Sequence, residues 1–225
     1  MLMENLLPKE IEDEIKRHPI VYVPWGAMEW HGEHLPLGQD ALKAFAICCR
    51  VAERTGGIVF PPLYIGHQTL KVYGFPYTLE FSRELVKKLA LELLQQLDAI
   101  GFKVIVILCG HYGKKHLEAI EEAVKEYKSK GGRAQVLAVP EYVFAEDKGY
   151  KGDHAAKWET SIFWYFYPSM VHIERLICKK ELKGIYGDDP RKYASRDLGE
   201  IVVNVIVDRL VEKVKGMLKE ASKMT

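Results

Sequence analysis

Glu29 and His31 stand two residues apart in the segment that follows the first apolar run of the chain. In an extended segment, side chains at this spacing point the same way, so the carboxylate and the imidazole can bind one ligand together. Asp40 follows at the expected start of a helix and can join them. Paired divalent ions in hydrolases lie about 3.5–4 Å apart and are held by imidazoles and by carboxylates, one of which usually bridges. These residues therefore indicate water activation by metal ions.

His111 and Glu159 complete the candidate ligand set. His111 follows the apolar segment 102–109 after a single glycine, and Glu159 lies in GDHAAKWETS together with Asp153 and His154. Two carboxylates and two histidines nearly satisfy a dinuclear centre, so Glu159 is the candidate fifth ligand. Ca²⁺ sites do not favour imidazole, and structural zinc sites use more thiolate. The donor set therefore fits two ions of Zn²⁺, Mn²⁺ or Fe²⁺.

The same residues also permit a purely structural interpretation. Glu29 and His31 could be ordinary loop residues, and Asp40 could serve only as the N-cap of its helix. His111 could be a polar group at a strand end, and Glu159 could be favoured by the field of a helix N-terminus without any metal. The spacing alone leaves both interpretations open.

The elements that must position these side chains alternate along the chain. Apolar runs predict strands at 20–24, 57–60, 102–109 and 133–139, and helical spacing predicts helices at 8–18, 40–56, 82–100, 114–130 and roughly 192–221. This alternation predicts one domain over residues 1–225, an α/β fold built as a three-layer α/β/α sandwich with a mostly parallel sheet. Ligands bind beyond the carboxyl ends of the strands in such sheets, where the first four candidate ligands stand.

The composition excludes several classes of partner. The chain has 48% hydrophobic and 28% charged residues, with 32 Lys and Arg against 31 Asp and Glu, so we expect a nearly neutral globular protein that binds neither nucleic acid nor membrane. No stretch approaches the roughly 20 apolar residues of a membrane span, and the first residues do not resemble a secretion signal. We expect a cytoplasmic protein, and the four cysteines, which form no Cys-x-x-Cys pair, to be reduced.

The segment PWGAMEWHGEHLPLGQD resembles the signature of the creatininase family, which is roughly Pro-x-Gly-x-x-Glu-x-His-Gly-x-His-Leu-Pro-x-x-x-Asp. Three later blocks agree in order. They are the strand that ends in Gly110-His111, the run from His154 through Glu159-Thr160-Ser161, and Gly184-Ile185-Tyr186-Gly187-Asp188 before Ala194-Ser195. The resemblance extends over about residues 18 to 200.

This resemblance implies a metal-dependent hydrolase of amide or amidine C–N bonds, with the three-layer fold and often a hexameric assembly. We therefore expect a homo-oligomer that acts on a small-molecule amide, cyclic amide or formamide through a water activated by two metal ions. It also implies that Asp40 bridges the ions, with His31 on one ion and Glu29 with His111 on the other. His154 matches a catalytic histidine of the family. It would protonate the leaving amine, oriented by the preceding carboxylate, Asp153.

Two departures from the family pattern affect the choice of substrate. Creatininase itself has a ligand carboxylate two residues after the strand-end histidine, where this chain has Gly113. This difference argues against creatinine as the substrate and makes Glu159 the expected source of the missing carboxylate. Many relatives have a Gly-His-Gly-Gly-Asn loop, and here Lys114 replaces the amide side chain.

Other functions remain open at this point. A metal-dependent sugar isomerase or phosphoesterase could use the same ligands, with Lys114 near the site, and a non-catalytic relative could keep the metal alone. Cys109 could act as a thiolate nucleophile beside His111, although a small buried strand-end residue fits its position better. We expect three further histidines to face solvent: His18, His116 and His172.

Overall fold

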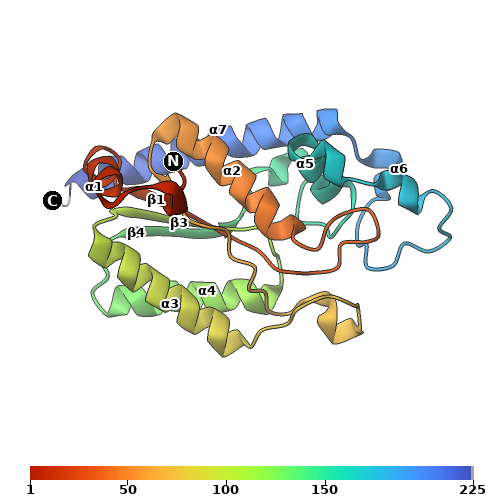
Figure 1. Ribbon diagram of the computed structural model, residues 1–225, viewed down its shortest axis with the longest axis horizontal. Helices are drawn as coiled ribbons and strands as arrows, with labels where there is room; N and C mark the ends of the chain where they lie inside the picture. Colours follow the sequence, from red (N-terminus) through yellow and green to blue (C-terminus); the bar gives the residue numbers. More distant parts are fainter. Residues whose placement is uncertain (224–225) are drawn as a thin grey trace.

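A computed structural model, which describes residues 1–223, places a parallel sheet between two layers of helices (Figure 1). The strands are β1 (Ile20–Trp25), β2 (Ile58–Val59), β3 (Val104–Cys109) and β4 (Gln135–Pro140). Their order is β2-β1-β3-β4, and every neighbouring pair is parallel. The predicted three-layer α/β/α sandwich is confirmed.

Different helices form the two layers that cover the sheet. Helices α2 (Gln39–Thr55), α5 (Lys157–Phe166) and α7 (Arg196–Lys223) cover the upper side of the sheet in Figure 1, and α3 (Arg83–Ile100) and α4 (Lys114–Ser129) cover the lower side. Helix α1 (Pro8–Arg17) precedes β1, and the short α6 (Pro190–Tyr193) precedes α7. Short 3-10 helices lie in the connections, at Met3–Asn5, Leu70–Tyr73, Glu141–Phe144, Glu146–Lys148, Pro168–Met170 and Ile173–Leu176.

The central strands are apolar on both faces because both faces are covered. Successive side chains of a strand point to opposite sides, so Val21 and Ile105 pack into the core between the sheet and helices α3 and α4. Tyr22 and Val106 point the other way, into the core formed with α2 and α7. All four side chains are fully buried. A parallel sheet enclosed in this way explains the continuous apolar runs of the sequence.

Most predicted elements agree with the structure to within a few residues. The C-terminal helix begins at Arg196 because a separate short helix, Pro190–Tyr193, precedes it and is capped by the side chain of Asp189. The second strand pairs only over Ile58–Val59. Within residues 1–223, no helix combines the length and apolar character needed to cross a membrane.

The strand register brings three chain segments to one edge of the sheet. Trp25 pairs with Cys109 and Cys109 pairs with Pro140, so the residues that follow β1, β3 and β4 emerge together. Two glycines at this edge let the first turn of α2 lie directly on the strand ends. A Cβ on Gly26 would lie 2.2 Å from the Ala41 nitrogen, and one on Gly110 would lie 2.1 Å from the Asp40 carbonyl oxygen. Any other residue at either position would push α2 away from the sheet.

Candidate metal centre

The five predicted ligands converge at this edge of the sheet in two overlapping groups that share Asp40. We call Glu29, Asp40 and His111 the first ligand group, and His31, Asp40 and Glu159 the second ligand group. In each group, one ligand atom from every residue lies within 4.8 Å of the others, and all five side chains are buried. Glu29 and His31 come from the loop after β1, Asp40 from α2, His111 from the end of β3, and Glu159 from α5.

Asp40 faces both groups at once. Its Oδ1 lies 2.9 Å from His31 Nε2, and its Oδ2 lies 3.4 Å from His111 Nδ1. The alternative interpretation of Asp40 as the N-cap of its helix is wrong, because Gly38 occupies the cap position and Asp40 is the second residue of α2. Its carboxylate is therefore directed at the two histidines, as a bridging carboxylate would be.

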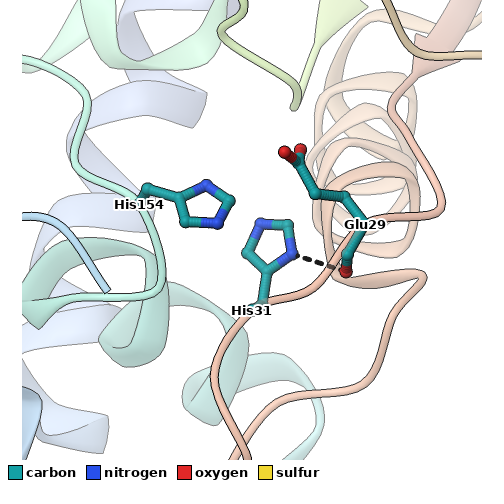
Figure 2. Close-up of side chains that lie close together, drawn as sticks. All are labelled: Glu29, His31 and His154. Carbon is teal, nitrogen blue, oxygen red and sulfur yellow. Dashed lines mark hydrogen bonds between the residues drawn. The ribbon is translucent and has the colours of Figure 1, made fainter. Parts of the chain in front are cut away.

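Both histidines are held by one ring nitrogen, which leaves the other for a ligand. His31 Nδ1 lies 3.0 Å from the Glu29 carbonyl oxygen, and His111 Nε2 lies 2.9 Å from the His67 carbonyl oxygen. An N–H that donates to a carbonyl fixes the tautomer and aims the opposite lone pair, as metal-binding histidines usually require. Figure 2 shows the His31 ring tied to the Glu29 backbone and lying between the Glu29 carboxylate and His154.

The fit to a metal ion rests on buried polar atoms of the ligand groups. Among residues 1–223, Glu29 Oε2, His31 Nε2 and Asp40 Oδ2 are buried side-chain atoms whose close polar neighbours are other members of the ligand groups: Glu29 Oε2 lies 2.9 Å from His111 Nδ1, and His31 Nε2 lies 2.9 Å from Asp40 Oδ1. Buried polar atoms are almost always satisfied, and leaving a carboxylate oxygen unsatisfied is costly. These three atoms belong to the two ligand groups, so divalent ions would satisfy all of them together.

The neighbouring carboxylates determine the pKa values of the two histidines, His31 and His111. Burial lowers the pKa of His31, but the charges of Asp40, Glu159 and Glu29 outweigh burial and raise this pKa to about 9. Burial also lowers the pKa of His111, and the neighbouring Glu29 and Asp40 raise it well above its ordinary value. A cation bound between these residues would replace the ring protons, so metal binding should release protons.

Glu159 has a different environment from the other carboxylate ligands. Its Oε2 accepts a hydrogen bond from the Ala155 backbone N–H at 2.8 Å and lies 3.6 Å from His31 Nε2. Its Oε1 accepts from Lys43 Nζ at 2.5 Å. A side chain at position 113 would require the His111 ring and the His67 backbone to shift, because a Cβ on Gly113 would lie 2.7 Å from both His111 Nε2 and the His67 carbonyl oxygen.

A cavity of about 260 Å³ opens onto these residues. Its walls combine the ligand groups with the residues after β3 and the segment before α5: Glu29, Asp40, Gln68, Leu70, Gly110, His111, Tyr112, Gly113, Gly152, Asp153, His154, Glu159 and Tyr186. The polar centre is therefore accessible to a small molecule.

Sequence comparison places this chain in a known family. The sequence model of the family described as creatinine amidohydrolase matches residues 4–214. The chain belongs to the creatininase family. Creatinine amidohydrolase of Pseudomonas putida is 26% identical over 87% of this chain and 88% of its own length. A mycofactocin precursor peptide peptidase of Mycolicibacterium smegmatis is 28% identical over 71% of this chain and 63% of its own length.

Solved creatininase structures share the fold of this chain. A manganese form, "Creatininase Mn", superposes with a TM-score of 0.79 at 25% identity and covers 96% of this chain and 97% of its own. An E122Q mutant creatininase of the Zn–Zn type gives a TM-score of 0.78 at 25% identity, with the same coverage. The present chain is thus a creatininase-family hydrolase.

The two residues predicted to be catalytic in this creatininase-family chain have separate partners. His154 Nε2 lies 2.9 Å from the Trp30 carbonyl oxygen, and its ring centroid lies 4.2 Å from that of His31. The carboxylate of Asp153 accepts from the backbone N–H groups of Trp158 at 2.7 Å and Glu159 at 3.0 Å. Neither of these bonds joins Asp153 to His154, and the role of Asp153 in orienting that ring remains a prediction. The loop before α5 directs this carboxylate to the start of the helix, and the Trp30 carbonyl holds His154.

Burial affects both of these residues. Burial and the nearby charge of Glu159 raise the pKa of Asp153 to about 7. Burial and the charge of His31 lower the pKa of His154, which favours the neutral ring. His154 also forms a possible third group with Glu29 and His31, whose ligand atoms again lie within 4.8 Å of one another. Its predicted role as an acid–base group rather than a ligand remains a prediction.

Sequence reasoning missed two buried charged residues beside the centre, Lys43 and Glu141. Lys43 lies one helical turn after Asp40, and Glu141 directly follows β4 at the edge where the ligands meet. Both side chains are fully buried. The signals that could have found them are the helical spacing from Asp40 and the position of Glu141 immediately after a strand.

Two minor expectations had different outcomes. His116 does not face solvent: it is fully buried, with ring centroids 5.8 Å from Trp25 and 5.1 Å from His111, because α4 turns this side chain toward the strand ends. His18 and His172 are partly exposed, as expected. Cys109 is a buried strand-end residue whose thiol pKa is raised by burial, which argues against a thiolate nucleophile.

Proposed function

We propose that this protein hydrolyses a C–N bond of a small-molecule amide, cyclic amide or formamide, with two divalent metal ions of Zn²⁺, Mn²⁺ or Fe²⁺. The observation that carries the proposal is the pair of ligand groups that share Asp40, with buried polar atoms in both whose close neighbours are other ligands. The manganese and Zn–Zn forms of creatininase, which have the same fold, support the choice of metals.

The residues divide the work of such a reaction among them. Bound ions would polarise the substrate carbonyl and lower the pKa of a bound water from 15.7 toward about 7. Glu29, His31, Asp40, His111 and Glu159 would hold the ions. The Trp30 carbonyl holds the His154 ring beside His31, and the lowered pKa of His154 keeps it able to accept a proton at neutral pH. His154 would then pass this proton to the leaving nitrogen.

The cavity and its walls limit the substrate. A volume of about 260 Å³ suits a small molecule rather than a folded protein. The relatives act on different amides, since one is a creatinine amidohydrolase and another a precursor peptide peptidase. Gly113 stands where creatininase has a ligand carboxylate, so we propose a substrate other than creatinine.

We also propose a homo-oligomer in the cytoplasm, with the hexamer that the family resemblance implies as its expected form. Large apolar side chains are exposed in the loop between β2 and α3, among them Val72, Tyr73 and Tyr77, which are 60%, 73% and 76% exposed. Contact with another copy would remove them from water. Light scattering on the purified protein measures the assembly directly.

The decisive experiment is elemental analysis of purified protein, followed by a substrate screen with the metal that is found. The screen contains cyclic amides, formamides and small peptides, and it detects released amine or ammonia. Assays for phosphate release and for aldose–ketose exchange run in parallel, with the Asp40→Ala variant as the blank. Metal-dependent amine release would support the proposal. Turnover only in a parallel assay, or no metal in supplemented and folded protein, would refute it.

A further inference from the structure

Lys43 is a buried lysine that touches a candidate ligand but is not itself a ligand. It lies on the face of α2 that carries Asp40, and its side chain is 0% exposed. A lysine is rarely buried unless its ammonium group is fully paired. Its surroundings therefore need an explanation beyond packing.

The ammonium group has an acceptor for each of its three N–H bonds. Nζ lies 2.5 Å from Glu159 Oε1, 2.6 Å from the Tyr112 hydroxyl and 2.9 Å from Glu141 Oε1. Tyr112 in turn donates to the same oxygen of Glu141 and contacts the Tyr150 hydroxyl at 2.5 Å. Lys43 is thus anchored, on the side away from Glu159, by a buried polar network of Glu141, Tyr112 and Tyr150. With Nζ fixed in this way, it can hold Glu159 in one orientation.

As a consequence, the two carboxylate oxygens of Glu159 have different partners. Oε1 accepts from Lys43, whereas Oε2 accepts from the Ala155 N–H and lies 3.6 Å from His31 Nε2. An isolated carboxylate can rotate and bind an ion through either oxygen or both. Here the two donors hold its plane, so Glu159 presents a single oxygen to the second ligand group.

We propose that Lys43 is a positioning residue that makes Glu159 a one-oxygen metal ligand and thereby controls how tightly the second ligand group holds its ion. This inference rests on the proposed function. The hydrogen bonds and the ion pair of Lys43 go to Tyr112, Glu159 and Glu141, of which only Glu159 is a candidate ligand, so its direct effect should fall on the second ligand group.

A purely structural role predicts a different result. If Lys43 only balances the charges of Glu141 and Glu159, its removal would make the site more negative and the second ion would bind as tightly or more tightly. If Lys43 positions Glu159, the second ion should bind more weakly even when the net charge is restored. Partners that orient a metal ligand typically contribute about 10–100-fold to metal affinity.

Two variants separate these roles. Lys43→Met removes the ammonium group but leaves Glu141 as an uncompensated buried carboxylate, which endangers folding. Lys43→Met combined with Glu141→Gln removes one charge of each sign, so the net charge equals that of the parent. Lys114→Met is the matched control, because this lysine is 83% exposed at the start of α4.

The measurement is a titration of metal-free protein with Zn²⁺ against a chelating dye, which yields both stepwise dissociation constants, with melting curves to check folding. We expect the double variant to bind its first ion within about twofold of the parent and its second ion at least about tenfold more weakly. Parent-like binding of both ions, or equal weakening of both, would overturn the proposal. If the parent itself binds no zinc, the proposed function fails, which is a separate outcome.

Discussion

The two ligand groups share Asp40 but differ in how their remaining carboxylate is supported. In the first group, Glu29 accepts from the Leu70 N–H through Oε1, and its Oε2 lies 2.9 Å from another ligand, His111 Nδ1. In the second group, both oxygens of Glu159 already accept hydrogen bonds, from Lys43 and Ala155. A metal ion that replaces the ring proton of His111 leaves the Glu29 oxygen free to bind the ion, whereas the oxygens of Glu159 remain shared with Lys43 and Ala155 and gain less. We therefore expect the first position to bind its ion more tightly.

Replacement of the shared residue should have the largest effect, because it removes the feature that joins the two groups. We expect Asp40→Ala to lose both ions and all amide hydrolysis, since its two oxygens lie 2.9 Å from His31 Nε2 and 3.4 Å from His111 Nδ1, one in each ligand group. Elemental analysis after metal supplementation and dialysis tests this prediction. Glu121→Ala, at a 63% exposed side chain on α4, is the control. If Asp40→Ala retained one tightly bound ion, the two positions would be independent and Asp40 would not be a bridge.

His154 lies beside both groups, and its replacement tests whether the two-group description is complete. We expect His154→Ala to keep both ions and to slow amide cleavage by about 10²–10⁴-fold, the usual contribution of an acid–base group. Turnover and metal content should be measured on the same preparation. Loss of an ion would instead assign His154 to the third group, with Glu29 and His31, as a ligand.

Glu159 distinguishes the second group from the first. We expect Glu159→Gln to retain about half of the metal and little activity, because it weakens one position and spares the other. His111→Ala is the matched variant for the first group and should also lose one ion. If Glu159 serves only the N-terminus of α5, the change should cost about 1 kcal/mol of stability with full occupancy. Metal content and melting temperature together decide between these outcomes.

Asp153 should have the smallest effect, because it supports the second group only through the start of α5. Asp153→Ala removes the acceptor for the Trp158 and Glu159 N–H groups and should cost about 1 kcal/mol in the free energy of unfolding. We expect both ions to remain bound. Denaturant unfolding of the metal-free protein measures the change in stability. A fall in the rate comparable to that of His154→Ala would show that Asp153 acts in the reaction after all.

The local sequence was sufficient to predict the four strands, most of the helices and the region of the site. The apolar runs along β1 and β3 predict buried strands because a parallel sheet covered on both faces needs no polar side. Residues that follow such strands, Glu29, His31 and His111 among them, must meet at one edge because all the carboxyl ends of parallel strands point the same way. The polar cluster of Asp153, His154 and Glu159 indicated Glu159 as a ligand far along the chain, and the motif resemblance gave His154 its predicted catalytic role.

Only the tertiary structure decided how the individual side chains are used. Asp153 and His154 are adjacent in sequence, yet one bonds to the start of α5 and the other to the Trp30 carbonyl. Lys43 and Glu141 read as ordinary charged residues until α2 and the end of β4 bring them together at 2.9 Å. Periodicity and motif spacing report which face of an element is buried, but the partner of a buried charge is set by contacts between residues far apart in sequence. Those contacts exist only once the sheet and its helices have packed.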